Sequence, residues 1–373
     1  MTFEILHQSK KSKARVGLLH TQHGTIHTPS FVAVGTNGTL KSIDNQTAIE
    51  IGLELMFCNT YHLLIQPGPD VIRQLGGLHK FINRPFPIIT DSGGFQTFSL
   101  SYGSVSRELK SGGAKLPHSQ VLQVNEEGVL FRSYRDGQEI FLTPESSIQA
   151  QKCFGADIII PLDELPPFHT PQKKLYESFY RTHRWELRSL KEHEKNPQHQ
   201  IIYGVIHGGL NPSLRKKSLT LLSAHNFDGF AIGGSVGKTK EEMFDMLASL
   251  SPHLPHNKPI HLLGIANPDV LDKCLSLGID TYDSSYPTKI ARHGSLLTKN
   301  GIIHIHKKIY QDQETPIDPT CSCPTCTKYS TAYLHHLFKS KELNALSMAS
   351  IHNLYFMICE MREKRKKILH NLL

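Results

Sequence analysis

The chain has 373 residues, of which 39% are hydrophobic and 20% charged, and its formal net charge is +8. This composition is typical of a globular protein, and the length allows one large domain or two smaller ones. No apolar run approaches the roughly 20 residues that cross a bilayer, and the amino terminus lacks a signal-peptide pattern. We therefore expect a cytoplasmic protein with no membrane partner. The positive charge favours a polyanionic partner, nucleic acid above all, although each basic cluster alone is more simply a solvated surface.

Eight short apolar runs recur along the chain, with amphipathic segments between several of them. The runs cover residues 31–34, 55–58, 87–90, 157–162, 201–206, 229–232, 261–263 and 280–282. Runs that are apolar throughout are typical of parallel strands buried on both faces. Helices are predicted over 214–225 and 240–250, where apolar residues recur every three to four positions. A third helix is predicted over 268–278, which begins with proline and ends with glycine. The pattern predicts an α/β fold, a TIM-type (β/α)8 barrel.

The remaining segments are expected to lie outside the strands and helices of this barrel. The first thirty residues indicate a hairpin with its turn at His23-Gly24, closing the bottom of the barrel. Residues 101–127 are rich in serine, glycine and lysine without periodicity, and they predict a long inserted loop that is mobile or disordered. We expect the barrel to cover residues 1–300 and a helical subdomain to cover residues 301–373.

A metal-ligand pattern lies near the carboxyl terminus. Cys321, Cys323 and Cys326 fall within six residues, and His352 follows on a predicted helix from about 347 to 369. This is the ligand set of a structural Cys3His zinc site, in which four protein ligands leave no open position for catalysis. The alternative is a chance grouping of three cysteines. We expect one structural Zn²⁺ per chain, so the chemistry must lie elsewhere.

Polar residues and glycines follow the third to eighth apolar runs. They are Asp91-Ser92-Gly93-Gly94-Phe95-Gln96, Asp163-Glu164, His207-Gly208-Gly209, Gly233-Gly234-Ser235, Gly264 and Asp283. Active sites of (β/α)8 barrels lie at the carboxyl ends of the strands, so these residues should share one mouth. Two carboxylates there suit nucleophile and acid–base work at a glycosidic carbon, and a third could accept from a purine edge. The alternative is that each group is a cap or turn.

The sequence resembles the bacterial tRNA-guanine transglycosylases, the queuine tRNA-ribosyltransferase family. The resemblance rests on residues 59–63, 90–96, 229–234, 278–283, 287–288 and 332–336, together with the zinc ligands, and it covers nearly the whole chain. It implies a (β/α)8 barrel with a zinc-bearing subdomain, usually a homodimer. It also implies exchange of the wobble guanine of certain tRNAs for a free 7-deazaguanine base.

The resemblance also implies roles for individual residues. Asp283 would be the nucleophile that forms a covalent ribosyl-enzyme, and Asp91 the general base that deprotonates the incoming base at N9. Asp163 would read the amino and N1 edge of the base, and Phe95 and Leu263 would sandwich its ring. The expected base-contacting positions are Ser92, Gly93, Gly94, Phe95, Asp163, His207, Gly208, Gly234 and Leu263. The expected RNA-contacting positions are Gly264, Thr288, Lys289, Ile290, Ala291 and Arg292.

Three departures from the family pattern leave the incoming base open. His207 stands where glutamine is common, Lys289 replaces the usual arginine, and the segment from Gly233 to Lys238 is one residue shorter and ends in lysine instead of glutamate. We favour queuine over the aminomethyl precursor, because Lys238 would repel the precursor's compact cation. The alternatives are a non-catalytic RNA-binding paralogue, against which both aspartates argue, and a retaining glycosidase, which leaves the basic charge and zinc cluster unexplained.

Overall fold

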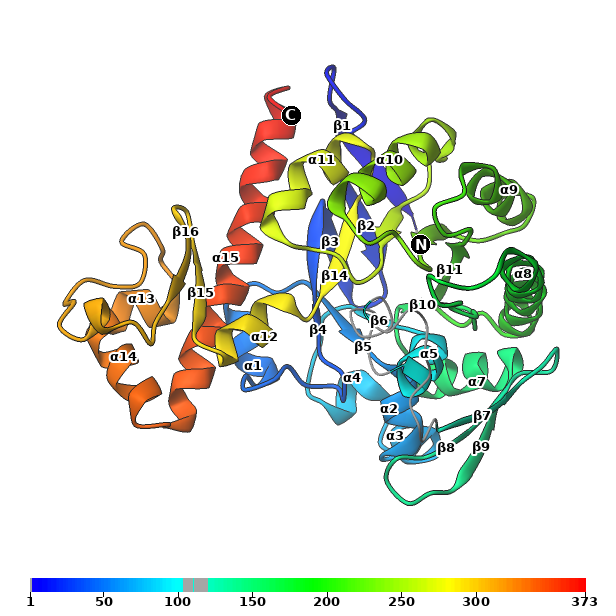
Figure 1. Ribbon diagram of the computed structural model, residues 1–373, viewed down its shortest axis with the longest axis horizontal. Coiled ribbons are helices and arrows are strands. Elements are labelled where there is room, and N and C mark those ends of the chain that lie inside the picture. Colours follow the sequence, from blue (N-terminus) through cyan, green and yellow to red (C-terminus); the bar gives the residue numbers. More distant parts are fainter. Residues whose placement is uncertain (1, 103–109, 111–119) are drawn as a thin grey trace.

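The computed structural model describes residues 2–102, 110 and 120–373, and its centre is a closed barrel of eight parallel strands (Figure 1). The strands are β4 (Ser30–Val34), β5 (Leu55–Cys58), β6 (Ile88–Thr90), β10 (Ile158–Ile159), β11 (Ile201–Ile206), β12 (Gly229–Ile232), β13 (Ile260–Leu262) and β14 (Thr281–Ser284). Each one falls on a predicted apolar run. The closing pairs are β14 with β4 and β6 with β10, which confirms the (β/α)8 prediction.

Helices follow the strands and cover the barrel. They are α1 (Asn45–Glu50), α2 (Thr60–Ile65), α3 (Pro69–Gln74), α4 (Leu78–Phe81), α5 (Gly94–Tyr102), α7 (Pro144–Phe154), α8 (Gln172–Glu194), α9 (Pro212–Ser223), α10 (Lys240–Leu250), α11 (Leu271–Ser276) and α12 (Tyr286–Arg292), with 3-10 turns η1 (Ser251–His253) and η2 (Pro268–Val270). The three helices predicted between the barrel strands correspond to α9, α10 and the pair η2–α11. Alternating strand residues separate two cores: Phe57 and Val205 fill the barrel, whereas Met56 and Ile206 pack beneath the helices.

The amino terminus forms more than the predicted hairpin. Strands β1 (Phe3–Gln8), β2 (Arg15–Thr21) and β3 (Gly24–Thr28) make a three-stranded antiparallel sheet. Its second turn lies between β2 and β3, so it starts one residue earlier than predicted. Leu19 and Ile26 pack with the residues that fill the barrel, and His23 bonds to Asp157 at the start of β10. The sheet therefore closes the bottom of the barrel, as expected.

The predicted loop over residues 101–127 is wrong at both of its described ends. Residues 101–102 belong to α5, and Val121–Val124 forms strand β7, which pairs with β8 (Val129–Arg132) and through it with β9 (Glu139–Leu142). Phe131 of this antiparallel sheet packs on Tyr61 and Trp185, so apolar burial holds the sheet against the barrel. Residues 103–109 and 111–119, on which the expected mobility falls, lie outside the described residues.

The carboxyl-terminal elements gather beside one helix. They are β15 (Ser295–Thr298), β16 (Gly301–His304), η3 (Lys308–Tyr310), α13 (Pro324–Lys328), α14 (Thr331–Lys339) and α15 (Leu343–Leu369). Figure 1 shows α15 in red, with α13, α14 and the β15–β16 hairpin beside its first half and the barrel beside its second half. It contacts α12, β4 and β2 as well as α13 and α14. No helix in the described part of the chain has the length and apolar character to cross a membrane.

Candidate functional site

Asp91 lies directly after β6, at the carboxyl end of the barrel, and is 8% exposed. Its Oδ2 accepts from Asn59 Nδ2 at 2.6 Å and from Gln96 Nε2 at 3.2 Å, and its Oδ1 accepts from the Thr60 N–H at 2.7 Å. Burial raises the pKa of Asp91 to about 6, although these three hydrogen bonds favour the ionised form and Asp163 opposes it. Asp91 can therefore exchange a proton near neutral pH.

Asp163 follows β10 and forms a second polar group at the same end of the barrel. Its Oδ1 accepts from Ser92 Oγ at 3.0 Å, and its Oδ2 lies 3.2 Å from His207 Nε2. That nitrogen is buried but not aligned for a hydrogen bond. Gly94 must be glycine, because a Cβ there would lie 2.3 Å from the Asp163 carbonyl oxygen. Four of the predicted site positions therefore lie around the Asp163 carboxylate. They are Ser92, Gly94, His207 and Gly234, the last of which lies beside the imidazole of His207.

Asp283 lies in β14 and is 6% exposed. Its Oδ1 accepts from the Gly264 N–H at 2.7 Å and lies 3.1 Å from His261 Nε2. Gly264 has a positive φ of 76°, a conformation that glycine adopts without strain and that turns its N–H towards the carboxylate. His261 was not expected from the sequence. The signal that could have found it was a polar ring inside a strand that is otherwise apolar.

The remaining predicted positions differ in accessibility. Phe95, at the start of α5, is 46% exposed, and Leu263 packs beside Gly233 at the end of β13. In α12, Thr288 and Ala291 are buried, Ile290 is half-buried and Lys289 is exposed. The half-buried Arg292 donates from Nη1 to the Thr288 carbonyl at 2.9 Å. Lys289 therefore offers the most accessible charge of the predicted RNA-contacting segment. Gly93 and Gly208 both adopt positive φ values, so glycine is the residue that fits there.

A cavity of about 220 Å³ opens beside His207 and Gly234. Pro166, Phe168, Leu175 and Phe179 give it apolar walls. Two residues of its lining carry a buried polar atom that has no hydrogen-bond partner among the described residues, Ser178 Oγ and His207 Nε2. Unpaired buried polar atoms are costly, so they mark places where a ligand could supply the partner. Sequence reasoning missed this cavity because α8 supplies several of its walls, and the packing of this helix against the strand ends has no local sequence pattern.

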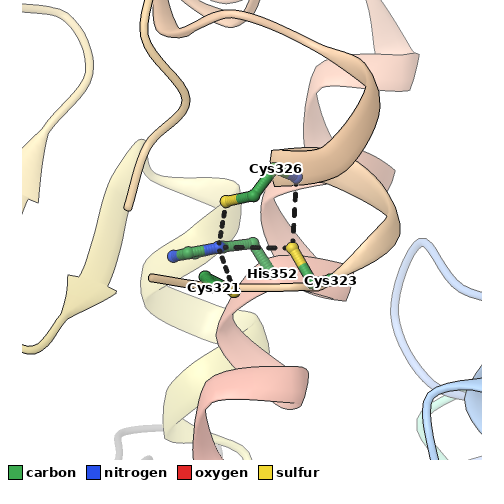
Figure 2. A group of neighbouring side chains, drawn as sticks. All are labelled: Cys321, Cys323, Cys326 and His352. Atoms are coloured by element: carbon green, nitrogen blue, oxygen red, sulfur yellow. Dashed lines mark hydrogen bonds between the residues drawn. The ribbon is translucent and has the colours of Figure 1, made fainter. Parts of the chain in front are cut away.

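The predicted metal ligands converge (Figure 2). The Sγ atoms of Cys321, Cys323 and Cys326 lie 3.8, 3.5 and 3.3 Å from His352 Nδ1. Tetrahedral coordination at the usual Zn–S and Zn–N lengths would separate sulfur and nitrogen by about 3.6 Å. The His352 Nε2–H donates to the Leu297 carbonyl at 2.8 Å, which leaves Nδ1 unprotonated towards the thiols. Among the described residues this cluster can hold a metal ion, and its chemistry fits zinc.

Fold and site together define a class of protein. Three carboxylates from β6, β10 and β14 lie at the carboxyl end of one parallel barrel, where TIM-type enzymes carry their catalytic residues. The cluster of three cysteines and His352 joins α13 to α15 and lies in a core separate from that of the barrel. The chain is therefore a (β/α)8 enzyme with a separate candidate metal site.

Comparison with known proteins identifies the family. The family described as queuine tRNA-ribosyltransferase matches residues 9–373. The queuine tRNA-ribosyltransferase of Protochlamydia amoebophila is 58% identical over 371 residues, covering 100% of this chain and 96% of the relative. Those of Chlamydia caviae and Chlamydia trachomatis are 54% and 51% identical over 372 residues, each covering 100% of this chain and 99% of the relative. The chain belongs to the queuine tRNA-ribosyltransferase family, the tRNA-guanine transglycosylases, and is a transferase.

Proposed function

We propose that this enzyme replaces the wobble guanine of a tRNA with a 7-deazaguanine base, in two displacements through a covalent ribosyl-enzyme. The observation that carries the proposal is the contrast between two aspartates at one barrel mouth. Burial raises the pKa of Asp91 to about 6, which suits proton transfer near neutral pH. Within the portion of the chain that the structure describes, Asp283 accepts hydrogen bonds through Oδ1 alone, which leaves Oδ2 to attack a sugar carbon.

In the first displacement, Asp283 Oδ2 forms a bond to C1′ of the ribose while the bond from C1′ to N9 of guanine breaks. Guanine leaves as its N9 anion and takes a proton from Asp91. In the second displacement, Asp91 takes the proton from N9 of the incoming base, N9 attacks C1′, and the bond to Asp283 breaks. Protons balance over the cycle, and two inversions at one carbon retain the β configuration.

The group around Asp163 suits recognition of the base. An ionised carboxylate accepts from the amino group and N1–H that guanine and 7-deazaguanines share. Ser92 Oγ donates to that carboxylate and holds it in place, and the His207 imidazole lies beside it. Phe95, half exposed, and Leu263 would cover the two faces of the ring, and the other glycines of the site would let backbone approach it. Water exclusion by these groups strengthens the polar contacts.

The incoming base that we favour is queuine. Its cyclopentenediol has an apolar ring and two hydroxyl groups, and the cavity beside His207 offers apolar walls with unpaired polar atoms at Ser178 and His207. Lys238 Nζ lies 4.5 Å from the centroid of the Phe168 ring on the cavity wall, so a compact ammonium would meet a like charge there.

Steady-state exchange with both bases decides between them. We expect a higher kcat/KM for queuine than for 7-aminomethyl-7-deazaguanine. Ser178→Ala should lower kcat/KM for queuine about tenfold and leave the aminomethyl base unchanged, because only queuine would reach that hydroxyl. Thr220→Ala, on the exposed side of α9, is the matched control. A preference for the aminomethyl base in the unaltered enzyme would contradict the choice of queuine without affecting the exchange reaction.

We further propose that the metal is one structural Zn²⁺, held by Cys321, Cys323, Cys326 and His352. Bound zinc would tie the loop before α13 to α15 and supply no catalytic position, since all four ligands are protein atoms. The tRNA would meet Gly264 and α12, where Lys289 is exposed. We propose a homodimer that acts in the cytoplasm, as the family resemblance implies. These statements rest on ligand chemistry, charge and family membership.

Incorporation of radiolabelled guanine into tRNA tests the exchange itself. The unaltered enzyme should label tRNA, Asp283→Asn should abolish labelling, and Asp312→Asn, an exposed carboxylate, should not alter it. Asp91→Asn should retain attack on ribose and slow turnover, so that a tRNA adduct accumulates. Stable tRNA binding without labelling by the unaltered enzyme would indicate a non-catalytic RNA-binding protein and refute the proposal.

A further inference from the structure

The nucleophile proposed above is held asymmetrically. Both hydrogen bonds to the Asp283 carboxylate reach Oδ1, from the Gly264 N–H at 2.7 Å and from His261 Nε2 at 3.1 Å. Within the described parts of the chain, Oδ2 accepts no hydrogen bond. A carboxylate accepts only, so His261 Nε2 must carry a proton and donate. The contacts therefore fix the rotation of the carboxylate and leave one oxygen unengaged.

The imidazole of His261 is itself fixed on its other side. Its Nδ1 lies 2.8 Å from Thr281 Oγ1, which is two residues before Asp283 on the same face of β14. The parallel register pairs His261 of β13 with Thr281 of β14, so the ring spans the interval between the threonine and the aspartate. When the ring is neutral, the Thr281 hydroxyl donates to Nδ1, which reserves the Nε2 proton for Asp283.

Burial excludes a direct role for His261 in binding RNA. The residue is 0% exposed, and its ring lies 6.2 Å from the ring of Phe57 in the barrel interior. A buried imidazole needs a hydrogen-bond partner at each ring nitrogen, and both nitrogens of His261 have one. Among the residues that the structure describes, the side-chain hydrogen bonds of His261 connect it to β14, the strand that carries the proposed nucleophile. Its influence on the reaction must therefore act through Asp283.

We propose that His261 is a positioning residue that aims Oδ2 of Asp283 at C1′ and stabilises the same carboxylate when it departs. In the first displacement, the bond from Oδ2 to C1′ forms, and Oδ1 becomes the carbonyl oxygen of the ester. In the second, the bond from C1′ to Oδ2 breaks, and the electron pair returns to the carboxylate. The Gly264 and His261 donors remain on Oδ1 throughout and receive the returning negative charge. This inference rests on the proposed function.

The chain offers matched variants for a test. Glutamine can present its Nε2–H near the position of the histidine Nε2–H, and its Oε1 can accept from Thr281, so His261→Gln keeps both contacts. His261→Phe keeps an aromatic ring beside Phe57 and removes both contacts. Thr281→Val keeps the shape of the threonine and removes only the hydroxyl that fixes the tautomer. Together, the three variants distinguish the effect of the hydrogen-bond donor from the effect of the size of the ring.

The experiment measures the single-turnover rate at which a denaturation-resistant adduct forms with tRNA, beside tRNA affinity and melting temperature. We expect His261→Phe to slow adduct formation and its resolution by the incoming base about 10- to 100-fold, the effect of one lost hydrogen bond to a charged group. The tRNA dissociation constant should not change. His261→Gln should recover the rate to within about fivefold, and Thr281→Val should slow it less than His261→Phe does.

Each outcome bears on a separate claim. An unaltered adduct rate in folded His261→Phe would overturn the positioning role while leaving the exchange reaction intact. Loss of rate in His261→Gln equal to that in His261→Phe would show that the donor is not what matters, and would also overturn it. If His261→Phe does not fold, Thr281→Val decides: a slower adduct rate supports the positioning role, and an unaltered rate would overturn it. Absence of an adduct in the unaltered enzyme would instead refute the proposed function on which the inference rests.

Discussion

Replacing Asn59 with leucine should move the pH dependence of exchange. Asn59 Nδ2 donates to Asp91 Oδ2 at 2.6 Å, the shortest of the three contacts that favour the ionised carboxylate. The Asn59 side chain makes no capping hydrogen bond to α2, so the substitution acts mainly on Asp91. Leucine is similar in size and cannot donate. It therefore removes one hydrogen bond to a charged group and keeps water from replacing that bond.

The size of the effect follows from the pKa of Asp91, which burial raises to about 6. A hydrogen bond to a charged group contributes about 1.5–3 kcal/mol, which is about one to two pKa units at 1.36 kcal/mol per unit. Removing a donor that favours the ionised form raises the pKa further, to roughly 7–8. Because the ionised form is the base in the second displacement, activity should be lost as pH falls through this higher value.

The assay is kcat/KM for the incoming base between pH 5 and 9. The acidic limb should lie near pH 6 in the unaltered enzyme. In Asn59→Leu it should move up by about one to two units, with activities converging at high pH. Gln96→Leu, which removes the longer 3.2 Å contact, is the control and should give a smaller shift. A limb that stays in place or moves to lower pH in Asn59→Leu would refute Asp91 as the base.

Three further predictions concern the metal, the barrel bottom and the RNA. Cys323→Ala should lose bound zinc and lower the melting temperature, whereas a metal-free protein of full stability and activity would exclude a structural site. Burial alone would raise the pKa of Asp157, but hydrogen bonds from His79, His23 and the Ile88 N–H lower this pKa to about 2. Its ionised form thus contributes about 2–3 kcal/mol that is present above pH 4 and lost towards pH 2. Asp157→Asn should therefore lower the free energy of unfolding more at pH 6 than at pH 2.5. An equal loss at both pH values would contradict the lowered pKa of Asp157. tRNA affinity should fall linearly with the logarithm of salt concentration, with a slope about one unit smaller in Lys289→Ala; an affinity independent of salt would exclude phosphate contacts.

The barrel could be predicted because its strands are apolar on both faces, but their ends could not. The run 157–162 yields only Ile158–Ile159 as strand. The side-chain amide of Gln151 accepts from the Ile160 N–H at 3.1 Å and donates to the Ile160 carbonyl at 2.9 Å. Because both backbone groups of Ile160 are engaged in this way, the strand stops pairing with its neighbours there. A tertiary contact thus sets a boundary that no local pattern contains. The candidate metal ligands were predictable because their spacing encodes one compact cluster.

The site was only partly visible in the sequence. Asp91, Asp163 and Asp283 were predictable because each follows or ends an apolar run, and parallel strands bring such ends together. His261 was not, because its contact with Asp283 depends on the register between β13 and β14. The cavity beside His207 was hidden for a similar reason, since Ser178 and Phe179 come from α8. Contacts set by packing across the fold carry no local sequence signal.

Mapping the covalent adduct tests the central claim most directly. The enzyme is quenched with tRNA in the absence of an incoming base, digested with nuclease and protease, and analysed by mass spectrometry. We predict a nucleotide mass, without its guanine, on the peptide that contains Asp283, and no such mass in Asp283→Asn. The same mass on any other residue, or no adduct while guanine exchange proceeds, would contradict the double displacement at Asp283.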